Sequence, residues 1–402
     1  MSSQSRYDAF VITAPGLESL AVAELRALGA SDLRVTEGGA TYTATRRSLY
    51  EANLHLRTAS RIVVRAAEFG ARSFHELERL ARTVPWEAFF SPNLGVALRV
   101  TCRKSRLYHS DAVAERVAGA ITSRLSTVRI GDDEGDESET ERQLVLVRFF
   151  HDRCTISIDS SGPLLHLRGY RQATAKAPMR ETLAAATLMA SGWHGGAPLL
   201  DPMCGSGTIP IEGAMIARRI PPGLGRRFAF DRWPDFDAAT WQSVVDAARS
   251  AILPSSPVRI LGSDRDTGAV QAATENAARA SVPDDVELSV RPISAIDPPA
   301  AEGWLVSNAP YGVRVGERHQ LKNLYAQLGN VVRSKCPGWH IALVTADPML
   351  ERQLRLPLTP VLRTSNGGIK VRVIAGESPA KRSNQRAEVD TPDTATAQRY
   401  PS

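Results

Sequence analysis

The sequence predicts an α/β protein with two architectures: small α+β units at the start of the chain, followed by a doubly wound, mostly parallel sheet. A chain of 402 residues exceeds the usual size of one domain. The first 66 residues show the order strand–helix–strand–strand–helix–strand, and strands alternate with helices from about 165 to 375. We therefore divide the chain into residues 1–65, 66–162, 163–376 and 377–402.

The first unit resembles a ferredoxin-like fold in the order of its elements. An apolar strand leads into a Pro-Gly turn, and LESLAVAELRALGA then places Leu and Ala at helical spacing until Gly29 ends the helix. The predicted strands are 7–13, 32–35, 40–44 and 61–66, and the predicted helices are 17–28 and 46–56. This order is typical of a split β-α-β arrangement.

The second unit combines two helices with three strands. The predicted helices are 75–82 and 110–125, and the predicted strands are 96–102, 144–151 and 154–159. Between the helix 110–125 and the strand 144–151 lies GDDEGDESETER, which is acidic and lacks apolar residues. We therefore expect a disordered surface loop there.

The third unit carries the alternation that predicts a doubly wound sheet. Its predicted strands are 198–201, 258–264, 285–290, 303–307, 339–345 and 369–374. The polar, proline-containing tail at 377–402 is expected to be disordered.

Charge and cysteine content limit the functional classes. The net charge is 49 − 43 = +6, which permits a polyanionic partner without requiring one. The four cysteines are far apart in sequence, so neither a metal site nor a disulfide framework is expected. The chain shows no signal core and no long apolar run. We expect a cytoplasmic monomer without metal or membrane contact.

The segment PLLDPMCGSGTIPIEGAMIA carries the strongest motif. A strand ends at Asp201, and a glycine-containing turn leads into a helix whose N-terminus favours an anionic group. The turn matches neither a P-loop nor the dinucleotide fingerprint. An acid at the strand end suits a ligand with both a cationic amine and a carboxylate, which describes S-adenosyl-L-methionine. The candidate cofactor contacts are Asp201, Pro202, Cys204, Gly205, Gly207 and Thr208.

A second acid, Asp264, ends the next predicted strand. This position suits hydrogen bonds to both hydroxyl groups of a ribose. Asp266 is expected to cap the helix that follows. The distance in sequence from Asp201 implies an insertion, RRIPPGLGRRFAFDRWPDFD, for which substrate contact and surface packing both stay open.

The stretch SNAPYG ends a further strand on the same carboxyl edge. The side chain of Asn308 and the main chain of Ala309 offer two carbonyl acceptors, and Pro310 keeps the backbone of Ala309 extended. Two fixed acceptors can hold the hydrogens of an exocyclic amino group while Tyr311 stacks on its base. Such positioning turns a delocalised amine towards a methyl donor. We predict that these four residues are catalytic.

Together these motifs resemble class I S-adenosylmethionine-dependent methyltransferases, in the form found in THUMP-containing RNA guanine-N2 methyltransferases. The resemblance covers most of residues 5 to 375. It includes LHLRGYRQATAKAPMRETLAAATLMASGW before the glycine loop, IPPGLGRRFAFDRW as the insertion and TSNGGIKVRVIAG as a last hairpin. It implies a Rossmann-like catalytic domain preceded by a ferredoxin-like and a THUMP RNA-binding region. It also implies ribosomal RNA or tRNA as substrate.

Two positions depart from that family's pattern. Ala309 stands where proline is usual, although its carbonyl is retained. Ser294 lies where an acid beside the adenine is common, and it or Asp297 is the candidate contact to the adenine amine.

Two basic stretches are candidates for RNA contact. They contain Arg103, Lys104 and Arg106 beside Tyr108, and Arg168, Arg171, Lys176 and Arg180 before the catalytic domain. A solvated charged face explains the first stretch equally well. His166, His194 and Cys204 are interpreted as packing, surface or loop residues rather than reactive groups.

Three functions fit these observations. Methylation of guanine N2 in structured RNA is our leading hypothesis. Methylation of adenine N6 in DNA or RNA is the alternative within enzymes, because the same loop serves both amines. An RNA-binding protein without catalysis is the third, supported only by Ala309 and Ser294.

Overall fold

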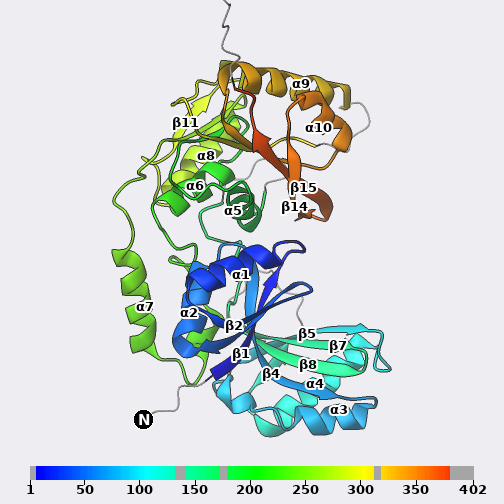
Figure 1. Ribbon diagram of the computed structural model, residues 1–402. Helices are drawn as coiled ribbons and strands as arrows, with labels where there is room; N and C mark the ends of the chain where they lie inside the picture. The colour runs from blue at the N-terminus through cyan, green and yellow to red at the C-terminus, as the bar shows by residue number, and fades with distance from the viewer. Residues whose placement is uncertain (1–5, 132–141, 173–178, 312–317, 381–402) are drawn as a thin grey trace, which may run out of the picture.

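The computed structural model describes residues 6–131, 142–172, 179–311 and 318–380 of the chain, arranged in an N-terminal lobe and a catalytic lobe (Figure 1). Most of the predicted acidic loop, most of the predicted tail and Lys176 lie outside these residues. Within the described part, no helix is long and apolar enough to cross a membrane.

The N-terminal lobe is built on one eight-stranded sheet of order β2-β3-β1-β4-β8-β7-β5-β6. Its elements are β1 (Arg6–Thr13), α1 (Glu18–Ala27), β2 (Ser31–Thr36), β3 (Gly39–Thr45), α2 (Arg46–His55), β4 (Ala59–Gly70), α3 (Phe74–Ala81), η1 (Trp86–Ala88), β5 (Gly95–Arg103), α4 (Ser110–Arg124), β6 (Arg129–Gly131), β7 (Arg142–Phe150) and β8 (Arg153–Asp159). The element types of both predicted α+β units are confirmed.

The two predicted units are not separate bodies, because β4 belongs to both. It pairs with β1 on one side and with β8 on the other, and one buried core extends through both units. The boundary that we drew between residues 65 and 66 therefore falls inside a strand. The predicted strand 61–66 ended early because the second half of β4 is only partly buried and loses the apolar signal.

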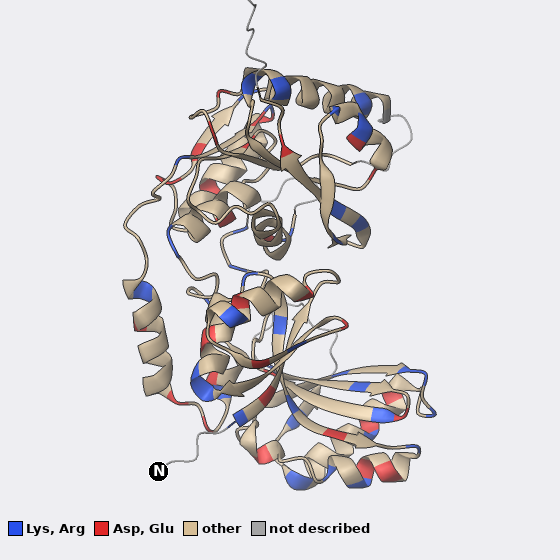
Figure 2. Ribbon diagram, viewed as in Figure 1, with Lys and Arg blue, Asp and Glu red and all other residues tan. Residues whose placement is uncertain are grey.

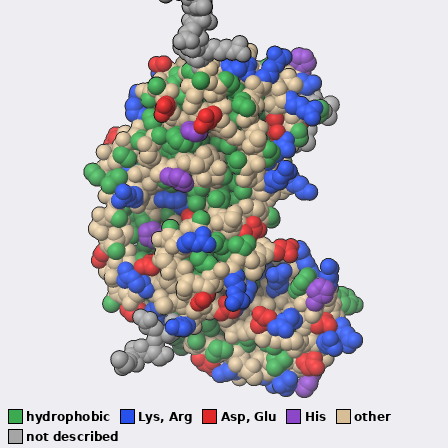
Figure 3. Space-filling model, viewed as in Figure 1, with side chains coloured by type: hydrophobic (Ala, Val, Ile, Leu, Met, Phe, Trp, Pro, Cys, Tyr) green, Lys and Arg blue, Asp and Glu red, His purple; other side chains and the backbone are tan. Residues whose placement is uncertain are grey.

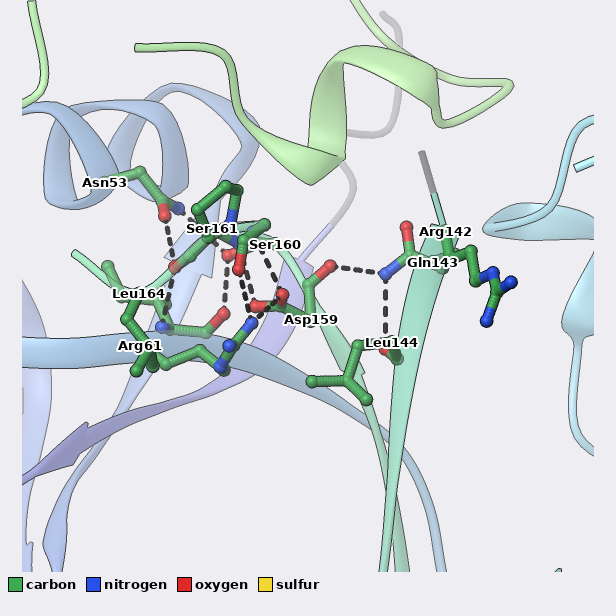
Figure 4. A network of polar contacts seen from close by, with 12 residues as sticks. Asn53, Arg61, Arg142, Gln143, Leu144, Asp159, Ser160, Ser161 and Leu164 are labelled. Carbon is green, nitrogen blue, oxygen red and sulfur yellow. Dashed lines mark hydrogen bonds and ion pairs between the residues drawn. The ribbon is translucent and has the colours of Figure 1, made fainter. Parts of the chain in front are cut away.

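A buried polar network fixes this shared part of the sheet (Figure 4). Arg61 on β4 forms an ion pair with Asp159 at the end of β8. The Asp159 carboxylate also accepts hydrogen bonds from the backbone N–H groups of Ser161 at 2.9 Å and Gly162 at 2.9 Å. The Ser161 hydroxyl donates a 2.7 Å hydrogen bond to Oδ1 of Asn53 on α2. Because each charge is paired and hydrogen-bonded, the cost of burying it is offset within the chain.

The catalytic lobe contains a seven-stranded sheet of order β11-β10-β9-β12-β13-β15-β14. Its elements are α5 (Glu181–Ala190), β9 (Leu199–Asp201), α6 (Thr208–Ala217), η2 (Ala229–Arg232), α7 (Ala238–Ser250), β10 (Ile260–Asp264), α8 (Thr267–Arg279), β11 (Glu287–Val290), η3 (Ile293–Ala295), β12 (Trp304–Asn308), α9 (Arg318–Lys335), β13 (His340–Thr345), α10 (Pro348–Leu354), β14 (Thr359–Asn366) and β15 (Ile369–Glu377). The pairs from β11 to β13 are parallel, and β15 runs antiparallel to both neighbours. The doubly wound prediction is confirmed. The edge strand β14 was absent from the predicted set, since only Leu362 and Thr364 are buried in it.

The insertion between α6 and β10 leaves the catalytic lobe and packs on the N-terminal lobe (Figure 1). The ring of Phe230 in η2 stacks on Tyr50 of α2, with 4.4 Å between centroids. Asp235 accepts a 2.6 Å hydrogen bond from the Tyr7 hydroxyl and pairs with Arg46 at 3.0 Å. Of the two roles left open by the sequence, the structure supports packing, and this packing connects the lobes.

Candidate active site

Three neighbouring strands at the centre of the catalytic sheet end in polar residues. Asp201, Asp264 and Asn308 are the last residues of β9, β10 and β12, and β9 pairs with both other strands. All three strands are parallel, so their carboxyl ends lie on one edge of the sheet. The strand order reverses beside β9, which is where open α/β sheets bind ligands.

The glycine loop between β9 and α6 is tied to the end of β10. The N–H of Cys204 donates to the carbonyl of Ser263 at 2.9 Å, and the N–H of Gly205 donates to Oδ2 of Asp264 at 3.0 Å. Gly207 has φ +83°, and a Cβ there would lie 2.9 Å from that of Ala273 on α8, so this glycine is needed for packing. Gly205 also has a positive φ, but a Cβ there would meet open space. Gly205 is thus the point at which the loop can approach a ligand.

Asp201 is a buried acid that is held by hydrogen bonds. Its Oδ1 accepts hydrogen bonds from the Ser307 hydroxyl at 2.6 Å and from the N–H of Met203 at 3.1 Å. Among the described residues it forms no ion pair. Burial raises the pKa of Asp201 to about 7. A buried carboxylate in this condition favours a cationic partner from outside the chain.

Asp264 is held in one orientation but keeps acceptor capacity. Its Oδ2 receives the Gly205 N–H, and its Oδ1 receives the N–H of Asp266 at 3.0 Å. Each carboxylate oxygen has a second lone pair for a ligand hydroxyl. The capping role predicted for Asp266 is confirmed, because its side chain accepts from the N–H groups of Gly268 and Ala269 at the start of α8.

The loop after β12 presents an unpaired acceptor. Oδ1 of Asn308 is buried and has no hydrogen-bond partner among the described residues. Ala309 is buried, Pro310 is exposed and Tyr311 is partly buried against the catalytic core. An unpaired buried carbonyl costs free energy until a donor arrives. This loop is therefore suited to a ligand that brings N–H groups.

Asn366 was missed by our sequence interpretation. It ends β14 at the tip of the last hairpin, and its Nδ2 donates a 2.9 Å hydrogen bond to the hydroxyl of Tyr311. The family resemblance predicted a hairpin here, but nothing local in the sequence shows which loop the hairpin contacts.

The other predicted cofactor residues differ in accessibility. Pro202, Cys204 and Thr208 are buried in the glycine loop, whereas Ser294 is exposed in η3. Burial raises the pKa of Cys204 well above its usual value, so its thiol stays protonated near neutral pH. This agrees with its interpretation as a loop residue. Within the described part, no group of three or more His, Cys, Asp or Glu residues could hold a metal ion.

The first predicted basic stretch lies on the surface. Arg103 ends β5, and Lys104 and Arg106 follow it before α4. All three are exposed, and Tyr108 is 68% exposed. Figure 2 shows Lys and Arg at the ends of the long strands of the N-terminal lobe. These side chains are available to a polyanionic ligand.

The structure corrects two members of the second basic stretch, Arg168 and Arg171, whereas Arg180 is exposed as expected. The Arg168 side chain is 1% exposed and lies 3.5 Å from a carboxylate oxygen of Glu212 on α6. Arg171 is 12% exposed, lies 3.2 Å from Glu181 on α5 and donates to the carbonyl of Met179. Both guanidinium groups serve internal ion pairs, so they do not form the basic surface that we expected. The sequence did hold a signal, since Glu212 is an isolated acid within an apolar helix.

A Rossmann-like sheet with a glycine loop and two strand-end acids is the arrangement expected of the class I S-adenosylmethionine-dependent methyltransferases. Residues 168–373 match the family model of the RMKL-like methyltransferase domain. Residues 8–63 match the RlmL ferredoxin-like domain, and residues 71–159 match the THUMP domain. The chain belongs to the THUMP-containing, RlmL-like family of RNA methyltransferases.

Two relatives cover nearly the whole chain. A putative RNA methyltransferase of Synechocystis sp. is 32% identical over 361 residues, 90% of this chain and 94% of the relative. A ribosomal RNA large subunit methyltransferase K/L of Syntrophotalea carbinolica is 37% identical over 383 residues, 91% of this chain. The chain spans 53% of that relative, about half of its length.

Solved structures of similar proteins show the same arrangement of both lobes. A putative methyltransferase, SMU.472, crystallised with S-adenosylhomocysteine, has a TM-score of 0.84 at 28% identity and covers 94% of this chain and 100% of its own. A protein of Listeria monocytogenes described as a predicted N6-adenine-specific DNA methylase has a TM-score of 0.84 at 28% identity, with coverages of 93% and 97%. The cofactor is therefore S-adenosyl-L-methionine, and the THUMP domain implies a structured RNA substrate.

Proposed function

We propose that this enzyme transfers a methyl group from S-adenosyl-L-methionine to the exocyclic N2 of a guanine in structured RNA. The observation that carries the proposal is the buried, unpartnered Oδ1 of Asn308 at the ligand edge of the sheet. It lies at the end of the strand next to β9, whose last residue is Asp201. A methyl acceptor that brings an N–H₂ group would satisfy this acceptor and the carbonyl of Ala309 together.

The arrangement fits the chemistry of an aromatic amine. Its lone pair is delocalised into the ring, so the free amine is a poor nucleophile. Hydrogen bonds to Asn308 and Ala309 localise the lone pair on nitrogen and direct it, while Tyr311 supports the base by stacking. Positioning and stabilisation of the developing positive charge then lower the barrier. No strong base is required before the attack.

The residues present fit the cofactor. Asp201 offers a carboxylate for its cationic amino group, Asp264 offers acceptors for its ribose hydroxyls, and Gly205 leaves space for close approach. When bound, S-adenosylmethionine supplies an electrophilic methyl group on a sulfonium. Ser294 is exposed after β11 and stays our candidate for the adenine amine.

Ribosomal RNA is the substrate class that we favour. The Syntrophotalea relative is a large subunit ribosomal RNA methyltransferase, and this chain spans about half of it. tRNA is the alternative structured RNA. In either case we propose that Arg103, Lys104 and Arg106 contact phosphates and that Tyr108 stacks on a base.

Methyl transfer from labelled S-adenosylmethionine to bacterial RNA tests the proposal. The RNA is purified from a strain that lacks its own counterpart of this protein, and the labelled product is analysed as nucleosides. We expect N2-methylguanosine in one RNA class. Label confined to other nucleosides contradicts the guanine-N2 assignment.

Adenine N6 is the second candidate acceptor. The Listeria structure is described as a predicted adenine-specific DNA methylase, and an adenine amine presents the same two hydrogens to Asn308 and Ala309. N6-methyladenosine in the RNA assay, or N6-methyladenine in a parallel assay on DNA, supports this alternative.

A further inference from the structure

A cavity of about 150 Å³ with a mixed polar and apolar lining lies between the two lobes. The N-terminal lobe contributes Ala14, Leu17 and Ser60 to its lining, and the catalytic lobe contributes Arg180, Thr182 and Leu183 at the start of α5. The hairpin of β14 and β15 contributes Thr364 and Gly367. Figure 3 shows that the molecule is hollowed between its lobes and that Lys and Arg side chains lie on both of them.

Two independent features of this cavity indicate an anionic ligand. Arg180 is exposed, lines the cavity and immediately precedes α5, whose N-terminus is the positive end of the helix dipole. Thr364 is 8% exposed, and its hydroxyl has no hydrogen-bond partner among the described residues. An exposed guanidinium and an unused hydroxyl are donors suited to the oxygens of a phosphate.

The carboxylate at the start of α5 is paired within the chain. Glu181, the first residue of α5, is 1% exposed and lies 3.2 Å from the guanidinium of Arg171. Burial raises its pKa to about 7. Among the described residues that line the cavity, Arg180 is the one with a charged side chain.

The position of the cavity connects it with the methyl acceptor. Thr364 and Asn366 are two residues apart on β14 and so lie on the same face of the strand. Asn366 donates a hydrogen bond to Tyr311, which we place against the target base. A group bound beside Thr364 would thus lie close to the target nucleotide.

We propose that this cavity, the phosphate pocket, binds a phosphodiester group of the RNA strand next to the target nucleotide. The proposal rests on the proposed function, because it assumes an RNA methyl acceptor. It assigns to Arg180 and Thr364 the placement of the strand, and it leaves cofactor binding to the glycine loop.

The Arg180→Gln variant tests the phosphate pocket, with Arg363→Gln as the matched control. Arg363 is an equally exposed arginine on β14 whose neighbour Thr364 lines the cavity, but Arg363 itself does not. We expect the KM for RNA to rise about tenfold in Arg180→Gln, because a charge-assisted hydrogen bond is lost. The slope of log Kd against log salt in filter binding should fall by about 0.7 to 0.9, the value for one phosphate contact.

Further measurements separate a local loss from a general one. Arg180→Lys keeps the positive charge, so its KM for RNA should be close to that of the wild type. Thr364→Val should raise the KM about threefold through loss of one neutral hydrogen bond. Calorimetry should show unchanged cofactor affinity in all variants. Equal KM and salt slope in Arg180→Gln and Arg363→Gln would overturn the pocket while leaving the methyltransferase proposal intact. If the wild type transfers no methyl group to RNA, the proposed function is refuted. Filter binding of RNA to the wild type and Arg180→Gln would still test the phosphate pocket.

Inorganic phosphate distinguishes a strand phosphate from a free anion. We expect phosphate alone to bind only weakly when titrated into the wild type, since a single free anion lacks the rest of the RNA contacts. Submillimolar binding of phosphate that depends on Arg180, without any effect of Arg180→Gln on RNA, would assign the cavity to a free anion and overturn the proposal.

Discussion

Two buried polar sites, one in each lobe, differ in how their groups are satisfied. In the N-terminal lobe, Asp159 is paired with Arg61 and hydrogen-bonded by two backbone N–H groups (Figure 4). In the catalytic lobe, Asp201 has hydrogen bonds but no cation, and Oδ1 of Asn308 has no partner among the described residues. The first set of groups stabilises the fold. The second set keeps binding capacity that a cofactor and a base can use.

The largest expected effect comes from removing the cation that is paired with Asp159 in the N-terminal lobe. Arg61→Met should destabilise the protein by about 3–5 kcal/mol, because it leaves the Asp159 carboxylate buried without its counter-charge. Denaturant unfolding measures the change. Arg65→Met is the matched control on the same strand, because Arg65 makes a 3.9 Å contact to the exposed Asp8 and lies over the Phe10 ring, so no buried charge is left behind. That control should cost about 1 kcal/mol or less. Similar losses in both variants would contradict the structural role of the Arg61 pair.

Removing the charge of Asp201 in the catalytic lobe should instead increase the free energy of unfolding. The folded pKa of Asp201, about 7, is raised above its unfolded value. Its contribution to stability is therefore present below the unfolded pKa and is lost as pH rises through about 7. Asp201→Asn should be more stable than the wild type at pH 8 by on the order of 2 kcal/mol. It should also bind S-adenosylmethionine about 10- to 100-fold more weakly.

Asp266→Asn is the control for this comparison. Asp266 is an exposed helix cap, and asparagine caps a helix equally well. Thermal unfolding and calorimetry should both give values close to those of the wild type. A loss of stability in Asp201→Asn at pH 8 would show that its charge is satisfied within the chain, against our account.

Cofactor affinity should depend on pH in a defined direction. The charged form of Asp201 binds a cationic amine, so affinity should tighten as pH rises from 6 towards about 7 and then level off. Calorimetry in buffers of different ionisation enthalpy should show proton release below this point. Asp201→Asn should lose the pH dependence. The same dependence in wild type and variant would assign the titration to another group.

The smallest effect is expected at Asn366. Asn366→Ala removes the hydrogen bond to the Tyr311 hydroxyl, and Tyr311→Phe removes it from the other side. Each should lower kcat about three- to tenfold, the value of one neutral hydrogen bond, with cofactor affinity unchanged. The double variant should be no worse than the single ones, because both remove the same interaction. Additive losses would show that the two side chains act separately.

Much of the candidate site followed from sequence because it depends on local order. Asp201, Asp264 and Asn308 each end an apolar strand, and parallel strands bring such ends to one edge. The contacts that escaped prediction join distant segments. Three of them depend on how elements pack: the sharing of β4 by both units, the hydrogen bond from Asn366 to Tyr311, and the ion pair of Arg168 with Glu212. Local periodicity carries no information about such partners.

The turnover of Asn308→Ala tests the central claim most directly. Methyl transfer to RNA and cofactor affinity are measured in this variant and in Asn323→Ala, an exposed asparagine on α9. We predict that Asn308→Ala lowers kcat about 100- to 1,000-fold, as loss of a preorganised acceptor does, while cofactor affinity and the unfolding midpoint hold. Asn323→Ala should retain full activity. Normal turnover in Asn308→Ala would contradict the account, because the unpartnered carbonyl would then have no part in presenting the amine.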